Sequence, residues 1–279
     1  MKFPLCRVIA MAGLLVVSTG GTPAFAAKTP ASNPARALVK RFANALVYVN
    51  LVVTIKVTAA GQPLPPREVK RDVVGTVISP GGLIVLSLAA LDPAEMLDGA
   101  RVNTPKGRVL LEVTDSEFKA VKIRRMDGTE IEARVVLKDT DLDLAFVAPV
   151  QADPVHPFVY VDLGNQAAPE LLDTGYVLSR ASKVFQTTPV IQRSDIISIL
   201  EKPRRRLLVQ VVAASCPMFD AEGRVYGICV RQMANGRPAG AIVLSAADVA
   251  ETAKLAAAAK PVETPKPAVE GSAAPGKAP

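Results

Sequence analysis

Few residues in this sequence could carry out nucleophilic catalysis. Acyl transfer by a serine needs a base that takes its proton and an acidic group that orients the base. The chain has one histidine, His156, which stands in a proline-flanked segment with the composition of a linker. Ser215 stands in a turn of small residues, and Asp143 precedes the apolar run 144–147. A serine, an aspartate and one histidine are therefore available, and the histidine stands in a segment with the composition of a linker.

The aspartates Asp139, Asp141 and Asp143 have a spacing that oxygen ligands of a cation could have. A calcium loop also needs a glycine at its centre and a distal glutamate, and both are missing here. An aspartate before a strand commonly caps a turn instead. We therefore predict no metal site in this segment and no cofactor for the protein.

Cys216 and Cys229 flank a predicted hairpin, whose reversal is centred on residues 221–223. If segments 216–219 and 225–229 pair as antiparallel strands, the two cysteines fall opposite each other, within reach of a disulfide. A disulfide is permitted in an exported protein. Two buried thiols that act as small apolar side chains are the alternative, and the sequence leaves both open.

The first 26 residues have the layout of a secretory signal peptide. Lys2 and Arg7 precede or border the apolar run 8–17, and residues 24–26 form an Ala-Phe-Ala cleavage site. The apolar run is too short to span a bilayer. We predict export to the periplasm or the extracellular space, with no stable membrane span after cleavage. An uncleaved anchor is the alternative.

Composition also delimits the other end of the chain and the classes of partner. Residues 256–279 are rich in Ala and Pro and lack periodicity, which predicts a disordered tail. Residues 27–37 form a linker.

The net charge of +7 is modest for the length and favours a mixed-charge surface over nucleic-acid binding. The one basic cluster, residues 202–206, is the place where an acidic partner could bind.

Between the ends, short apolar runs alternate with turn residues, which is typical of β-structure. Residues 72–91 contain two such runs around the turn Ser-Pro-Gly-Gly at 79–82. Residues 121–147 contain a strand-like alternation on each side of an Asp-Gly turn at 127–128. The stretch 211–228 adds a third set, with a turn of small residues before the cysteine hairpin.

These three segments resemble, in the same order, segments of trypsin-like serine proteases of the HtrA/Deg type. That family has the turn GNSGGP before an apolar strand, a polar turn such as DAEG, and a strand that ends in GI. Here the turn is Val-Ala-Ala-Ser-Cys-Pro, residues 212–217, followed by Asp-Ala-Glu-Gly and Val-Tyr-Gly-Ile. The resemblance places the nucleophile position at Ala214, one residue before Ser215.

The other two segments carry the remaining positions of the triad. The family pattern G-x-x-I-S-P-x-G-x-I matches this chain from Gly75 to Ile84, and its histidine falls on Ala89. The pattern D-x-x-x-D-L-A-V matches from Asp139, and its aspartate falls on Asp143. The resemblance thus implies a triad that has kept its aspartate and lost its base and its nucleophile.

The resemblance implies an all-β fold: a two-lobed, trypsin-like double β-barrel with a short N-terminal and a short C-terminal helix. The first lobe is expected over residues 38–150 and the second over residues 151–255, with no PDZ domain after them. Ser215 is a poor substitute nucleophile, because a shift of one residue along an extended chain turns the side chain to the other face.

Our first hypothesis is therefore an exported pseudoprotease that acts as a protein- or peptide-binding or scaffolding module, without hydrolysing peptide bonds. The alternative is an active HtrA-type serine endopeptidase that uses a non-standard site around Ser215. A third hypothesis is an envelope protein whose function resides in its tail. The oligomeric state is left open by the sequence.

Overall fold

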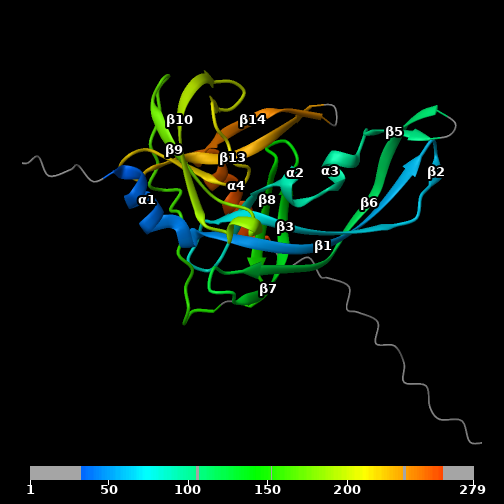
Figure 1. Ribbon diagram of the computed structural model, residues 1–279, viewed down its shortest axis with the longest axis horizontal. Coiled ribbons are helices and arrows are strands. Elements are labelled where there is room, and N and C mark those ends of the chain that lie inside the picture. The colour runs from blue at the N-terminus through cyan, green and yellow to red at the C-terminus, as the bar shows by residue number, and fades with distance from the viewer. Residues whose placement is uncertain (1–32, 105–106, 152, 235–236, 260–279) are drawn as a thin grey trace, which may run out of the picture. The chain divides into compact units, whose positions relative to one another are not determined.

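The predicted strands close into two antiparallel β-barrels of six strands each (Figure 1). The structure, a computed structural model, describes residues 33–104, 107–151, 153–234 and 237–259. This confirms the predicted all-β fold of two barrels with a few short helices. The predicted signal peptide of residues 1–26 and most of the predicted tail lie outside the described residues.

The first barrel is closed by β1, which pairs with β3 along one edge and with β6 along the other. Two register shifts in the β1–β6 pairing allow these long strands to follow the curvature of the barrel. In order around the barrel, the strands are β1 (Leu46–Ala59), β3 (Arg67–Val77), β4 (Ile84–Ser87), β8 (Leu144–Pro149), β7 (Glu130–Asp139) and β6 (Gly107–Arg124). The short strands β2 (Gln62–Pro63) and β5 (Arg101–Thr104) extend the sheet, and the helices α2 (Leu88–Leu91) and α3 (Ala94–Leu97) follow β4.

The second barrel contains the predicted cysteine hairpin. Its strands, in order around the barrel, are β10 (Pro189–Leu200), β11 (Arg206–Val209), β14 (Arg237–Ser245), β13 (Val225–Ala234), β12 (Pro217–Phe219) and β9 (Thr174–Arg180). The 3₁₀ helix η2 (Lys183–Phe185) lies between β9 and β10. The hairpin β12–β13 has the predicted antiparallel pairing, because its polar turn is held by Asp220, whose carboxylate accepts from the amides of Glu222 and Arg224.

A helix begins and ends the described chain, and each has a side-chain cap. The helix α1 (Pro34–Phe42) starts after Asn33, whose side chain accepts from the amide of Ala35. It continues into the 3₁₀ helix η1 (Ala43–Ala45). The helix α4 (Ala246–Ala258) starts after Ser245, whose hydroxyl accepts from the amide of Asp248. Both caps satisfy amides that would otherwise have no partner.

The boundaries differ from the sequence expectation in several places. The helix α1 begins inside the predicted linker 27–37, and α4 continues past residue 256, where the tail was predicted to begin. None of the helices in the described part of the chain is long and apolar enough to cross a membrane.

One hydrophobic cluster joins the barrels to each other and to the helices. It contains Phe146 of β8, Phe219 of β12 and Leu244 of β14, all buried. The ring of Phe42, from α1, stacks on the ring of Phe219 with 4.5 Å between their centroids. The two barrels therefore share one hydrophobic core.

Replacing Gly227 by alanine is expected to destabilise the second barrel severely. A Cβ atom at this position of β13 would lie 1.8 Å from the carbonyl oxygen of Leu244 in the paired strand β14. We expect a loss of more than about 3 kcal/mol in the free energy of unfolding, measured by urea denaturation. The matched control is Gly81→Ala, where the new Cβ would lie 3.9 Å from Ser79 Oγ, an ordinary contact distance. Equal stability of the two variants would contradict this account.

Candidate functional site

The structure brings Ala89 and Asp143 into direct contact. The amide of Ala89, in α2, donates to Asp143 Oδ1 over 2.7 Å, and the amide of Leu88 donates to the Asp143 carbonyl oxygen over 2.9 Å. Asp143 has a left-handed backbone with φ of 54°, a conformation that aspartate tolerates better than most residues. The two positions that the family resemblance assigned to the base and its orienting acid are thus neighbours.

Asp143 is held by two further donors, one from each barrel. The hydroxyl of Ser87 donates to Oδ2 over 2.5 Å, and the amide of Arg231 in β13 donates to the same oxygen over 2.8 Å. Burial raises the pKa of the Asp143 carboxyl above its ordinary value, although these hydrogen bonds oppose the rise. Both oxygens of the carboxylate therefore accept hydrogen bonds from within the protein.

Ser215 is fully buried and takes part in the same network. Its hydroxyl oxygen accepts from the amide of Ser87 over 2.9 Å, and its carbonyl oxygen accepts from the hydroxyl of Thr76 over 2.6 Å. Its own amide donates to the carbonyl oxygen of Cys229. Its φ of 69° is left-handed, so the turn that the family builds with glycines is built here at a non-glycine residue. Ser215 links the two barrels, and its side chain is not presented to solvent.

Ala214, at the position expected for the nucleophile, is half-buried and lines a pocket of about 300 Å³. The pocket lies where β3 and α2 of the first barrel approach β9 and β13 of the second. Ala90 lines it too, whereas Ala89 is buried beneath the surface. Methyl groups thus occupy the positions at which the resemblance would require an imidazole and a hydroxyl.

The only histidine of the sequence is held elsewhere. The ring of His156 is exposed and pairs with Asp153 over 3.0 Å between Nδ1 and Oδ2. Its carbonyl oxygen accepts from the guanidinium of Arg125. None of the hydrogen bonds formed by His156 in the described structure connects it to Asp143 or Ser215, so it does not supply the missing base.

Cys216 and Cys229 face each other across the β12–β13 hairpin, as predicted, and both are free, buried thiols. The amide of Cys229 donates to the carbonyl oxygen of Cys216 over 2.8 Å. Burial raises the pKa of both thiols, that of Cys229 to about 12. In this structure they therefore serve as small apolar side chains of the core, the second of the two alternatives that the sequence left open.

The three aspartates do not gather around a common point. Asp139 accepts from the amide of Leu142 in a local turn, Asp141 is exposed, and Asp143 belongs to the buried network. Within the described residues, no group of three acidic, histidine or cysteine side chains is arranged to hold a metal ion.

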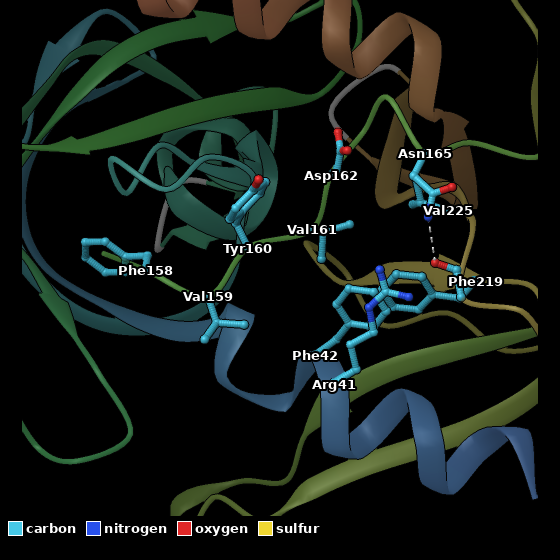
Figure 2. A pocket seen from close by; sticks show the side chains of 11 residues that line it. Arg41, Phe42, Phe158, Val159, Tyr160, Val161, Asp162, Asn165, Phe219 and Val225 are labelled. Atoms are coloured by element: carbon cyan, nitrogen blue, oxygen red, sulfur yellow. Dashed lines mark hydrogen bonds between the residues drawn. The ribbon is translucent and has the colours of Figure 1, made fainter. Parts of the chain in front are cut away.

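A second pocket, of about 370 Å³, lies beside α1 (Figure 2). Its wall includes the stacked rings of Phe42 and Phe219, the guanidinium of Arg41 over the Phe42 ring at 4.6 Å, and the segment 158–162. No residue that the sequence singled out for chemistry lines this pocket. The candidate site is therefore the pocket at Ala214.

Two groups at the site were not identified from the sequence. Ser87 connects Asp143 to Ser215, and its place inside the apolar run 84–91 was a usable signal, because a buried hydroxyl needs partners. The arginines Arg71, Arg180 and Arg231, which line the pocket, gave no such signal. Single arginines occur on many strands, so their presence in the sequence predicts nothing, and only the fold brings these three together.

Comparison with known proteins does not assign the chain to a family, because it matches no protein-family model and no curated protein.

Removing the Asp143 carboxylate should destabilise the protein, because three donors would lose their acceptor. We expect Asp143→Ala to lower the free energy of unfolding by about 3 kcal/mol, and Asp143→Asn to cost less, since it keeps an acceptor and tolerates the left-handed backbone. The exposed Asp141→Ala is the control and should be close to neutral. Thermal denaturation of the three variants tests the order, and a neutral Asp143→Ala would contradict it.

The two thiols should be unreactive in the folded protein. For the chain from Ala27 onward at pH 8, Ellman's reagent should react with Cys216 and Cys229 only after denaturation, because both are buried and their raised pKa values leave little thiolate. Asp141→Cys, at an exposed position, should react at once and serves as the positive control. Absence of free thiols in denatured, unreduced protein would show a disulfide instead.

Proposed function

We propose that this chain is an exported pseudoprotease of the HtrA/Deg type, which binds a protein or peptide partner and does not hydrolyse peptide bonds. The observation that supports it best is the hydrogen bond between the Ala89 amide and Asp143, over 2.7 Å. An acid that orients a base must lie against that base. Here the acid lies against the position assigned to the base, and the side chain there is a methyl group.

The absence of a base and a nucleophile at these positions carries a large kinetic penalty. Loss of the serine or the histidine from such a triad lowers the rate by about a million-fold. Ser215 is a poor replacement, because its hydroxyl oxygen is occupied by the Ser87 amide and its side chain is fully buried. Activity through Ser215 would require this network to open and would still lack a base within reach.

The proposed binding role is supported by the pocket between the two barrels. Two barrels that share a core leave an open pocket at the position of the lost nucleophile, and binding sites occur preferentially at such junctions. Export to the periplasm or the extracellular space is the part of the proposal that rests on the sequence alone, namely on the signal-like residues 1–26.

A fluorophosphonate probe, which reacts with activated serines, should not label the purified protein. Casein incubated with the protein should likewise stay intact, as followed by release of acid-soluble peptides. Ser215→Ala is the matched variant, and it should behave like the wild type in both assays. Labelling or casein cleavage that is present in the wild type and lost in Ser215→Ala would overturn the pseudoprotease proposal and favour an endopeptidase with a non-standard site.

A further inference from the structure

The pocket at Ala214 carries more positive charge than the structure neutralises. Arg71 from β3, Arg180 from β9 and Arg231 from β13 line it, and Asp72 is its only acidic residue. The Asp72 carboxylate is already occupied, since it accepts from the ammonium of Lys183 and the side-chain amide of Asn50. The three arginines therefore have no available carboxylate among the residues of the pocket.

Arg180 uses its hydrogen bonds without neutralising its charge. Its guanidinium donates to the carbonyl oxygens of Ala43, Leu46 and Thr187, all of them uncharged acceptors. Burial lowers the pKa of Arg180, as expected for a cation removed from water without a counter-ion. The side chain thus ties β9 to the first barrel and leaves its positive charge beside the pocket.

Arg71 is the group that the protein itself does not satisfy. Its Nη1 atom is buried and has no hydrogen-bond partner in the described structure. Burial and the nearby Arg231 guanidinium both lower the pKa of Arg71, and only Asp92 opposes them. Asp92 is itself paired with Lys138 over 2.7 Å. An unpaired buried donor destabilises a fold. Although Nη1 itself is covered, Arg71 as a whole is half-buried and lines the pocket, so its charge is open to an acceptor that binds from outside.

The backbone adds one further donor to the same wall. Ala213 and Ala214 both line the pocket, but the Ala213 amide donates to the Cys229 thiol, whereas the Ala214 amide donates to no group in the described residues. Both residues lie in an irregular segment between β11 and β12 and are half-buried. The pocket is therefore lined by the Ala214 amide and by the guanidinium of Arg71, together with the exposed Arg231. Such a surface suits a ligand that brings acceptors and negative charge.

We propose that this pocket binds a carboxylate side chain of an acidic peptide segment in a partner protein. The planar guanidinium of Arg71 matches the two oxygens of a carboxylate, and Arg231 at the open side supplies a second charge. A pocket of about 300 Å³ has room for one side chain. The amide of Ala214 offers an extended peptide a main-chain hydrogen bond. This inference gives the ligand chemistry of the proposed binding function and rests on it.

The test uses the chain from Ala27 to its end and two fluorescein-labelled decapeptides with amidated C-termini. One alternates alanine with glutamate, and the other alternates alanine with glutamine. Fluorescence anisotropy should show binding of the glutamate peptide, with the glutamine peptide at least tenfold weaker. Arg71→Gln and Arg231→Gln should each weaken binding of the glutamate peptide by about tenfold or more, as expected for lost hydrogen bonds between charged groups.

Arg193→Gln is the matched control. It removes the same charge from an exposed side chain of β10 that does not line the pocket, so it should leave binding unchanged. A second measurement separates a ligand-binding arginine from a structural one. Arg71→Gln should keep or raise the melting temperature, because it removes an unpaired buried donor and its repulsion from Arg231. A structural arginine would lower it.

Three results would overturn the carboxylate site: equal binding of the two peptides, no binding of the glutamate peptide, or a loss in Arg193→Gln as large as in Arg71→Gln. The peptides recovered from each titration are also weighed by mass spectrometry. Cleavage of a peptide that binds through Arg71 would overturn the pseudoprotease proposal and leave the carboxylate site standing. The failures of the two proposals are thereby distinguishable.

Discussion

The placement of the two barrels depends on one half-buried carboxylate and the donors around it. Asp143 belongs to the first barrel and accepts from the Arg231 amide of the second. Ser215 belongs to the second barrel and accepts from Ser87 and Thr76 of the first. A buried charge is stable only when its hydrogen bonds are made, so these contacts allow little freedom in how the barrels meet. Asp143 and Ser215 thus form a joint between the barrels.

This use of the network separates the groups that stabilise the fold from the groups that we propose to bind a partner. Ser87, Asp143 and Ser215 direct their polar groups inward, toward each other. The methyl groups of Ala90 and Ala214 leave space above them, and Arg71 and Arg231 border that space. The polar groups of these three residues thus stabilise the fold by bonding to one another. The positive charge of the site lies on the two arginines that border the pocket.

Local patterns in the sequence were sufficient for most of the fold. Alternating apolar residues marked the strands, and the Asp-Gly turn marked the β6–β7 hairpin. Errors occurred where local composition and packing disagree. Residues 34–37 were assigned to the linker and Ala256 to the tail, but they belong to α1 and α4, and Ala256 is buried in the core that the barrels share. The contact between Ala89 and Asp143 followed from the family resemblance, which carries long-range information that local patterns do not.

The sequence by itself determined which side chains stand at the positions that the resemblance assigns to a triad, because folding cannot supply a group that is not encoded there. Ala89, Ala214 and the single histidine are facts of composition and order. Only the tertiary structure decided what the remaining groups do. Whether Ser215 is exposed, whether Arg71 has a partner and whether two cysteines bond all depend on residues far away in the chain. The burial and the electrostatic environment of a side chain depend on which residues lie close to it in space, and the fold decides which residues those are.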